Sequence, residues 1–361
     1  MKPLPPFPWD RLTPYADKAR VHPGGIVNLS VGTPVDPVPE SIQAALTNAA
    51  DRPGYPATAG APEVRAAIEE WVRRQCGATG EFGVLPTIGS KEAIAGLPAM
   101  LELGRTAVVA IPKLAYPTYE VGALLADARC IRVDDPSFGS QRLLKLLWIN
   151  YPSNPTGEVL SPQRLRRIVS WARSRGIVVV SDECYLTLGW ERAPVSILHP
   201  DVCGPEPAGV LAVHSLSKRS NLAGYRAGFL AGDPRLVERL LAIRKHSGLI
   251  VPAPVQAAMA AALTDEVHAA EQKERYRRRR ELLRDALTAA GFRIDHSHAG
   301  LYLWTTRDED CWETVEFLSS AGILVAPGEF YGPTGTRHVR VALTASDERV
   351  ETACTRLAAL S

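Results

Sequence analysis

The hydrophobic pattern between residues 84 and 232 alternates between strand-like apolar runs and amphipathic stretches. The run at 177–180 (IVVV) is almost wholly apolar, which is typical of a parallel strand that is buried on both faces. Comparable runs recur along this part of the chain, at 84–88, 107–111, 145–150, 211–215 and 227–232. Strands that alternate with helices predict a mostly parallel sheet covered on both faces, with ligands at the carboxyl ends of its strands.

The helical signals between these runs are clearest at 161–176. Ser161 is a favourable N-cap, Pro162 suits the first helical position, and Gly176 ends the pattern. The same 3.6-residue period appears at 62–75, where Gly77 follows as the stop. Both stretches are therefore expected to be helices that pack one apolar face against the sheet.

After about residue 252 the alternation stops. A long, increasingly charged helical stretch is followed by three strand-like segments at 292–304, 323–332 and 338–344. The expected fold class is α/β, with a large domain at 40–252. A smaller α+β domain is expected to be built from both ends of the chain, 1–39 and 253–361.

Composition narrows the class of protein. The 361 residues carry a net charge of only +2, so no bulk electrostatic attraction to nucleic acid or membrane is expected. The apolar runs are all shorter than the roughly 18 residues of a membrane span. The six cysteines lack metal-ligand spacing, so we expect no metal and reduced thiols in a cytoplasmic protein. Four prolines within the first eight residues argue against a targeting helix.

The segment 211–229 ends an apolar run in a hydroxyl-rich loop that places Lys218 at its tip. Ser215 and Ser217 precede the lysine, and Arg226 follows eight positions later between two glycines. A lysine with a lowered pKa is a nucleophile that forms a Schiff base with an aldehyde cofactor. The alternative for a lysine at a strand end is a solvated charge, and the neighbouring residues favour the nucleophile.

Other predicted strand ends carry one polar group each. Ser90 and Lys91 open a helix, whose backbone N–H groups could bind a phosphate, although such a sequence is more often only a cap. Tyr116 could lie over an aromatic ligand or simply pack in its loop. Asn154 could hydrogen-bond a ring oxygen or be a turn asparagine before proline, and the two readings are about equally favoured.

Two charged residues lie within strongly apolar surroundings. Asp182 follows the buried run at 177–180, and Arg340 lies inside the apolar strand-like segment HVRVALT. Burying a charge costs free energy unless an opposite charge lies beside it. We therefore expect Asp182 to bind a cation and Arg340 to bind an anion such as a carboxylate. Tyr185 can reach the same ligand as Asp182, and Gly32 allows a close backbone approach.

These motifs together resemble a known family. SLSKRSNLAGYRAGF (215–229), with SNPTG and SDECY upstream and HVRVALT near the end, resembles the class I aminotransferases of fold-type I. That family depends on pyridoxal 5′-phosphate (PLP), and the resemblance spans almost the whole chain. It implies a large domain with a mostly parallel sheet sandwiched by helices.

The resemblance also implies a role for each residue. Lys218 would form the Schiff base with the cofactor and shuttle the proton, while Asp182 would pair with the protonated pyridine nitrogen. Tyr185 and Asn154 would hydrogen-bond the phenolic oxygen of the ring. The remaining implied contacts are Tyr116 stacked on the ring, Ser90, Lys91, Ser215, Ser217 and Arg226 at the phosphate, and Arg340, Asn154 and Gly32 at the substrate.

Tyr55, in GYPATAG, resembles the tyrosine with which the family reaches the phosphate of the partner subunit. The resemblance therefore implies a homodimer with shared active sites. Its other partners would be small molecules only, an amino acid and a 2-oxo acid, with neither nucleic acid nor membrane.

A narrower resemblance concerns the substrate. PFPWD, VNLSVGTPVDPVP and GYPATAG, among other segments, resemble actinobacterial N-succinyl-LL-diaminopimelate aminotransferases, which use 2-oxoglutarate and glutamate in lysine biosynthesis. The loop RSNLAGYR departs from the commoner aromatic-bearing version of the class. The sequence shows no second arginine for a distal carboxylate. Aspartate, aromatic and acetylornithine aminotransferases and a PLP-dependent β-lyase remain alternatives.

Overall fold

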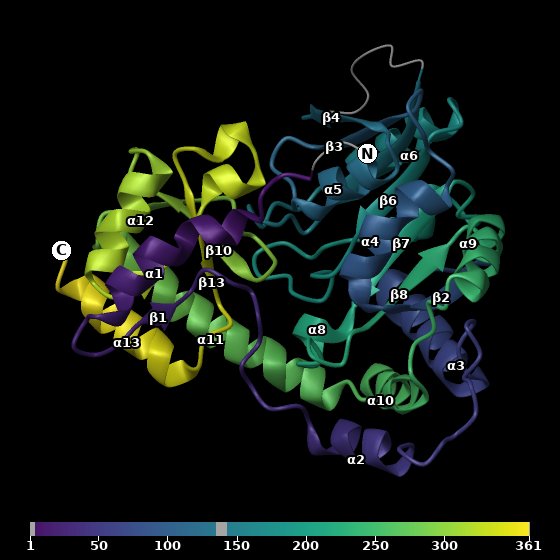
Figure 1. The fold of residues 1–361 in the computed structure, drawn as a ribbon, viewed down its shortest axis with the longest axis horizontal. Coiled ribbons are helices and arrows are strands. Elements are labelled where there is room, and N and C mark those ends of the chain that lie inside the picture. The colour runs from purple at the N-terminus through teal and green to yellow at the C-terminus, as the bar shows by residue number, and fades with distance from the viewer. Residues whose placement is uncertain (1–3, 135–142, 361) are drawn as a thin grey trace.

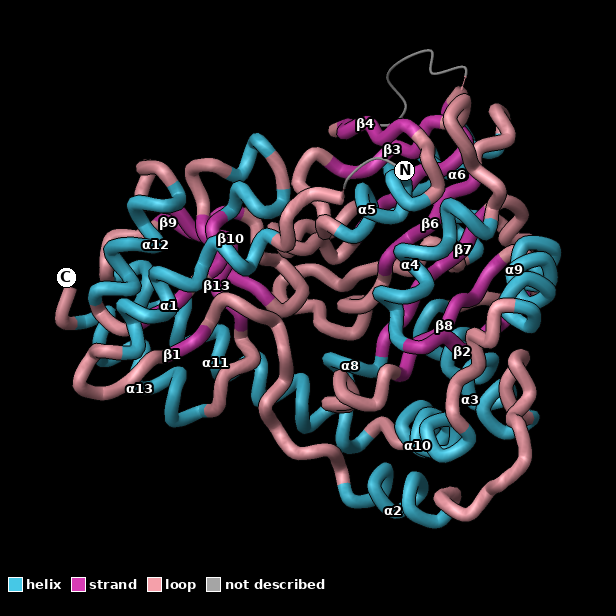
Figure 2. Tube along the Cα trace, in the orientation of Figure 1, coloured by secondary structure: helices cyan, strands magenta, loops and turns pink. Residues whose placement is uncertain are grey.

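The larger part of the molecule is built on a seven-stranded sheet (Figures 1 and 2). The computed structural model describes residues 4–134 and 143–360. The strands in spatial order are β2 (Gly83–Ile88), β8 (Ala227–Gly232), β7 (Val210–Ser215), β6 (Val178–Asp182), β5 (Leu144–Asn150), β3 (Val108–Pro112) and β4 (Arg129–Val133). The five strands from β7 to β4 are parallel, and β8 runs antiparallel to both of its neighbours.

Helices cover both faces of this sheet, which explains the nearly continuous apolar strands. Val179 and Val180 are consecutive residues of β6, yet they belong to separate cores on opposite faces. One face is covered by α3 (Pro62–Trp71), α6 (Pro162–Arg173) and α10 (Ala253–Thr264). The other is covered by α4 (Gly89–Met100), α5 (Thr118–Leu125) and α9 (Pro234–His246). The predicted α/β fold class is confirmed.

Helix α6 forms where its caps and apolar spacing predict it. The Ser161 side chain accepts a hydrogen bond from the Arg164 N–H at 3.3 Å, and Pro162 occupies the first turn. Its buried face consists of Leu165, Ile168, Val169 and Ala172. Burial of that stripe holds the helix against the sheet.

The smaller part of the molecule has its own core around a four-stranded antiparallel sheet. The strands in spatial order are β12 (Ala326–Pro327), β13 (Val339–Ala342), β10 (Tyr302–Thr306) and β9 (Arg293–Asp295). The helices around it are α1 (Thr13–Arg20), α11 (Val267–Ala289), α12 (Cys311–Ser320) and α13 (Asp347–Ala358). Strand β1 (Val27–Asn28) pairs in parallel with β11 (Ile323–Leu324), which ties the N-terminal segment to this part.

The remaining elements are short or connect the two parts. They are α2 (Glu40–Asn48), α7 (Pro200–Cys203), α8 (Leu216–Arg219), the π-helical turn Val72–Cys76, and the 3-10 turns Pro8–Leu12, Gly328–Tyr331 and Pro333–Gly335. Helix α11 extends from beside α8 to the smaller sheet (Figure 1). The division at residue 252 stays a prediction. Helix α10, which follows it, packs on α2 and α3.

Among the described residues, the structure contains no helix that is long and apolar enough to cross a membrane.

Candidate active site

The chemistry-bearing residues gather where the parallel strands of the large sheet end. Asp182 is the last residue of β6 and Ser215 the last of β7, and Lys218 follows on α8. Asn154 comes four residues after the end of β5. Arg340 approaches from β13 of the smaller sheet and donates a hydrogen bond to Asn154. The site therefore lies between the two parts of the molecule, at the sheet edge where parallel α/β proteins bind ligands.

Lys218 is partly buried, and both its side-chain amine and its backbone carbonyl are hydrogen-bonded. Its Nζ donates a hydrogen bond to the backbone carbonyl of Gly32, and its own carbonyl accepts one from the Tyr276 hydroxyl at 3.1 Å. Burial lowers the pKa of Lys218 to about 8, and the charges of Arg340 and Arg226 add to this effect. At neutral pH the neutral amine, which is the nucleophilic form, is therefore a larger fraction of Lys218 than of an ordinary lysine.

Asp182 is a buried carboxyl whose recorded partners are neutral donors. The Tyr119 hydroxyl donates to its Oδ2 at 2.7 Å, and the Cys184 N–H approaches its Oδ1 at 3.2 Å. Burial raises the pKa of Asp182, and these hydrogen bonds oppose the rise. A buried carboxylate is stabilised best by a cation, so the site is suited to a positively charged ring nitrogen.

Arg340 is only 3% exposed, and its guanidinium is fixed by uncharged groups. One Nη donates to the Asn154 side-chain oxygen at 3.0 Å, and the other to the Ser30 carbonyl at 2.7 Å. The guanidinium carbon lies 3.9 Å from the ring centroid of Tyr302. Arg340 is paired with no carboxylate of the described chain, and its buried Nε has no hydrogen-bond partner there. The arrangement leaves a positive charge available for an anionic ligand.

Two of the predicted phosphate residues, Ser90 and Arg226, form a cup at the N-terminus of α4. The Arg226 guanidinium covers Gly89, since a Cβ built on Gly89 would lie 2.3 Å from an Arg226 Nη. A Cβ on Gly228 would lie 3.0 Å from the Ser90 backbone nitrogen, so this glycine permits the close packing there. Helix N-termini with a nearby arginine bind phosphate through N–H groups and charge.

The other predicted phosphate residues differ in burial and in their distance from the cup. Ser215 and Ser217 are buried on either side of the α8 start, where the Ser215 hydroxyl accepts from the Ser217 N–H at 3.2 Å. The Lys91 side chain is exposed and lies over the ring of Phe7, 5.7 Å from its centroid, so Lys91 offers the cup only its backbone. Tyr55 is fully exposed and does not reach the site within its own chain.

Aromatic residues line the region between Asp182 and Arg340. Tyr116 meets Tyr119 edge to face at 5.9 Å, and burial raises the pKa of Tyr116. The Tyr185 hydroxyl lies 2.9 Å from that of Tyr302. The sequence reasoning missed Tyr119 and Tyr302. Tyr119 lies in the first turn of α5, three positions after Tyr116 in the preceding loop, and this closeness to Tyr116 is the one signal that could have found it.

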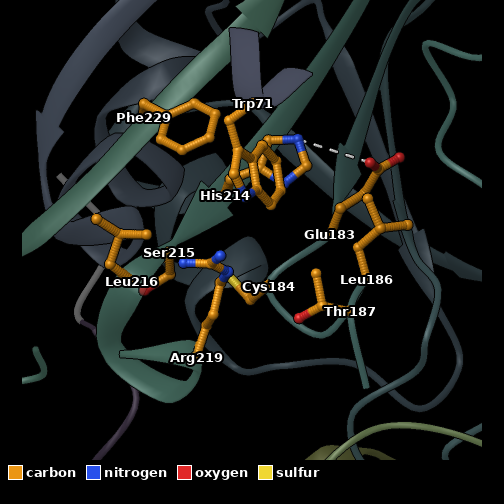
Figure 3. A pocket seen from close by; sticks show the side chains of 10 residues that line it. All are labelled: Trp71, Glu183, Cys184, Leu186, Thr187, His214, Ser215, Leu216, Arg219 and Phe229. Atoms are coloured by element: carbon orange, nitrogen blue, oxygen red, sulfur yellow. Dashed lines mark ion pairs between the residues drawn. The ribbon is translucent and has the colours of Figure 1, made fainter. Parts of the chain in front are cut away.

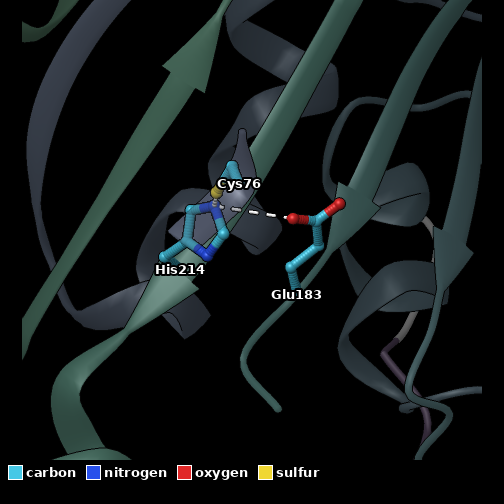
Figure 4. Close-up of side chains that lie close together, drawn as sticks. All are labelled: Cys76, Glu183 and His214. Carbon is cyan, nitrogen blue, oxygen red and sulfur yellow. Dashed lines mark hydrogen bonds and ion pairs between the residues drawn. The ribbon is translucent and has the colours of Figure 1, made fainter. Parts of the chain in front are cut away.

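A cavity adjoins the site on the side of β7 (Figure 3). Its lining includes Trp71, Glu183, His214 and Arg219. His214 lies 3.7 Å from both Glu183 and the Cys76 sulfur, and the three donor atoms fall within 4.8 Å of one another (Figure 4). Such a trio has the ligand types of a metal site.

The contacts of this trio assign it to the core instead. Both carboxyl oxygens of Glu183 already accept hydrogen bonds, from the Ser196 hydroxyl at 2.6 Å and the Ile197 N–H at 2.7 Å. Burial raises the pKa of Glu183 to about 7 and lowers that of His214 to about 3, so the imidazole is neutral at pH 7. Burial also raises the pKa of the Cys76 thiol, which keeps it protonated.

The comparison with known proteins decides the family. A family model described as aminotransferase class I and II matches residues 24–357, which include all of the site residues described above. The chain belongs to this family. Class I and II aminotransferases depend on PLP, so the cofactor that the sequence predicted is confirmed.

Individual relatives agree with this assignment over nearly the full chain. The aminotransferase is 55% identical to the 4-dedimethylamino-4-oxo-anhydrotetracycline transaminase OxyQ of Streptomyces rimosus, covering 99% of this chain and 100% of that one. It is 57% identical to a probable aminotransferase of Mycobacterium tuberculosis, over 98% and 85% of the two chains. A solved structure described as a probable N-succinyldiaminopimelate aminotransferase of Thermus thermophilus superposes with a TM-score of 0.88, at 27% identity, over 98% and 100%.

The residues of this aminotransferase fit PLP on structural grounds. The cofactor is an aldehyde with a basic ring nitrogen and a phosphate, and these groups need an amine, a carboxylate and a cationic cup. Lys218, Asp182 and Arg226 have these chemical groups and lie near the same edge of the large sheet, so they would suit the three parts of the cofactor. Within the described chain the buried Asp182 is hydrogen-bonded to neutral donors and has no cationic partner, and a side chain on Gly89 would clash with Arg226.

Proposed function

We propose that this aminotransferase moves the α-amino group of N-succinyl-LL-2,6-diaminopimelate to 2-oxoglutarate, forming glutamate, in lysine biosynthesis. The amino-transfer chemistry is that of its family. The observation that supports an amino acid as substrate is the buried Arg340. Its guanidinium is paired with no carboxylate of the described chain, so it is available to bind the substrate carboxylate. The choice of donor is supported by the sequence motifs and by the likeness to the Thermus thermophilus structure.

We assign the cofactor-facing roles as follows. Lys218 carries the cofactor, and Asp182 holds its ring nitrogen protonated, with Tyr119 orienting the carboxylate. Tyr185 and Asn154 bind the phenolic oxygen, and Tyr116 lies along the ring. The phosphate is held at the start of α4, at the start of α8 and by the arginine that follows α8. The residues at these three places are Ser90 and Lys91, Ser215 and Ser217, and Arg226.

In the amino-transfer reaction, Lys218 moves the proton, and Arg340 and Gly32 bind the substrate carboxylate. When bound, PLP supplies an electron sink that makes the Cα proton of an amino acid acidic. Lys218, whose pKa of about 8 leaves part of it neutral, takes that proton and returns it. Arg340 and the backbone at Gly32 fix the α-carboxylate, so the Cα–H bond faces the lysine. Proton transfer by a positioned base contributes about 10²–10⁴-fold.

We also propose that the active unit is a homodimer. Tyr55 is 100% exposed on the single chain, so its ring is accessible to a second chain. In a dimer Tyr55 would reach the phosphate cup of the partner subunit. Sedimentation velocity of the purified enzyme is expected to give a dimer, and an active monomer at micromolar concentration would exclude shared sites.

The lowered pKa of Lys218 predicts how cofactor uptake depends on pH. Only the neutral amine attacks an aldehyde, and at a pKa of about 8 roughly one tenth of Lys218 is neutral at pH 7. The rate of PLP attachment to apoprotein should therefore rise about tenfold per pH unit below pH 8 and level off above it. Stopped-flow absorbance measures this rate. A rate that continues to rise to pH 10 would indicate an ordinary lysine.

The donor is tested by a panel of amino acids with 2-oxoglutarate. We expect the highest kcat/KM with N-succinyl-LL-2,6-diaminopimelate, ahead of acetylornithine, aspartate and an aromatic amino acid. Glutamate formation is the readout, and release of pyruvate and ammonia would instead indicate a β-lyase. A higher kcat/KM with another donor in the panel would overturn the proposed substrate.

A second candidate function follows from the relative OxyQ. Identity of 55% over nearly the whole of both chains favours a substrate related to the one in its name, a ketone on a polycyclic ring. Such a substrate lacks an α-carboxylate in its oxo form. Amination of an oxo-anhydrotetracycline by glutamate, at a rate above that of the amino-acid panel, would select this candidate.

A further inference from the structure

Tyr302 occupies a central position that none of the assigned roles explains. It lies on β10, opposite Ala342 of β13, and Arg340 lies two residues before Ala342 on that strand. Side chains two residues apart on a strand share a face, so Tyr302 and Arg340 are diagonal neighbours above the site. Tyr302 is buried, with 4% of its surface exposed.

The two halves of the Tyr302 side chain contact different residues. Its hydroxyl lies 2.9 Å from the Tyr185 hydroxyl, and the two rings meet edge to face at 5.6 Å. Its ring lies under the Arg340 guanidinium at 3.9 Å. A guanidinium over a ring keeps its N–H donors in its own plane, and the donors that Asn154 and Ser30 do not use can bind a carboxylate there.

The backbone at Gly32 is shaped around the same tyrosine. A Cβ built on Gly32 would lie 2.2 Å from the Tyr302 hydroxyl, so only glycine leaves room for it. The Gly32 carbonyl also accepts the hydrogen bond from Lys218. Tyr302 therefore touches the residue that holds the lysine, the residue assigned to the cofactor oxygen and the residue assigned to the substrate carboxylate.

We propose that Tyr302 is a positioning residue that orients Tyr185 through its hydroxyl and Arg340 through its ring. This inference rests on the roles proposed above for Tyr185 and Arg340. If Tyr185 donates to the phenolic oxygen of a bound cofactor, its own oxygen would accept from the Tyr302 hydroxyl, which lies 2.9 Å away. Hydrogen bonds in such a chain strengthen one another and favour the ionised phenolic oxygen.

Tyr302→Phe tests the hydroxyl alone, because it keeps the ring under Arg340. We expect the visible pH transition of the lysine-linked cofactor to move upward by about 0.3–1 unit, since the phenolic oxygen loses support. Cys184 and Arg340, which also face Tyr185, are kept in the variant. Tyr331→Phe is the matched control, since the buried Tyr331 hydroxyl has no hydrogen-bond partner in the described chain. Its pH midpoint should equal that of wild type.

Tyr302→Leu tests the ring. Loss of the cation–π contact should raise KM for both glutamate and 2-oxoglutarate by about 3- to 30-fold, with a smaller change in kcat. Tyr302→Phe should leave both KM values near wild type. Circular dichroism melting and the dissociation constant for PLP show that each variant is folded and loaded, and Tyr302→Phe alone still decides the hydroxyl role if the leucine variant does not fold.

Two results would overturn the proposal. An unshifted midpoint in Tyr302→Phe removes the role toward Tyr185, and unchanged KM values in Tyr302→Leu remove the role toward Arg340. Arg340→Ala separates these failures from a failure of the proposed function. If Arg340→Ala raises KM and Tyr302→Leu does not, only the inference about Tyr302 fails; if neither raises KM, the carboxylate role of Arg340 fails as well.

Discussion

Replacing Lys218 by alanine should lower kcat by at least about 10²–10⁴-fold, because the variant loses the base that moves the Cα proton. It should also lose the visible absorbance of the lysine-linked cofactor, since position 218 on α8 then has no side-chain amine. Steady-state kinetics with 2-oxoglutarate and an absorbance spectrum of the purified protein measure the two effects.

Lys145→Ala is the matched control for this change. Lys145 lies on β5 of the same sheet but is exposed, so its removal should alter neither kinetics nor spectrum. A Lys218→Ala protein that keeps the visible band and wild-type turnover would show that another lysine carries the cofactor.

Replacing Arg340 by alanine should raise KM for both the amino donor and the 2-oxo acid by about 10²-fold or more. Both substrates present an α-carboxylate, and a charge-assisted hydrogen bond to such a group contributes about 1.5–3 kcal/mol. The guanidinium is already fixed by Asn154 and Ser30, so binding substrate costs it little further ordering. Initial-rate kinetics with each substrate varied in turn measure the effect.

Two variants control this experiment. Arg340→Lys keeps the charge but loses the fork that binds a carboxylate at two points, so its KM values should lie between those of wild type and alanine. Arg337→Ala removes an exposed arginine just before β13 and should leave KM unchanged. A rise in KM for only one of the two substrates would contradict a shared carboxylate clamp.

The sequence was most informative where a polar residue interrupts an apolar run. Asp182 and Arg340 stand out because a buried charge needs an opposite partner, and Lys218 stands out through its neighbours. The helix at 162–173 was readable because its cap, its apolar period and its stop agree. These signals are local, so they survive without any knowledge of the tertiary structure.

The residues missed by the sequence are those whose meaning depends on tertiary contacts. Tyr302 lies in an apolar strand, where a tyrosine is expected for its β-propensity alone. Its roles toward Tyr185 and Arg340 appear only when β10 and β13 pair above the large sheet.

The antiparallel direction of β8 was also not predicted, although the short connection between β7 and β8 explains it. Eleven residues join β7 to β8, and α8 is the one short helix within them. A parallel connection needs a crossover of a dozen or more residues, usually through a full helix. The same short connection carries both Lys218 and Arg226, so one loop can bind the two ends of a single cofactor.

Lys218 is the residue that we propose carries PLP. Reduction of the PLP-loaded enzyme with borohydride fixes the cofactor to its lysine, and mass spectrometry of the proteolytic peptides locates the modification. We predict that the pyridoxyl group is found on Lys218, in the peptide that contains SLSK. A pyridoxyl group on another lysine, or spread over several exposed lysines, would contradict the account.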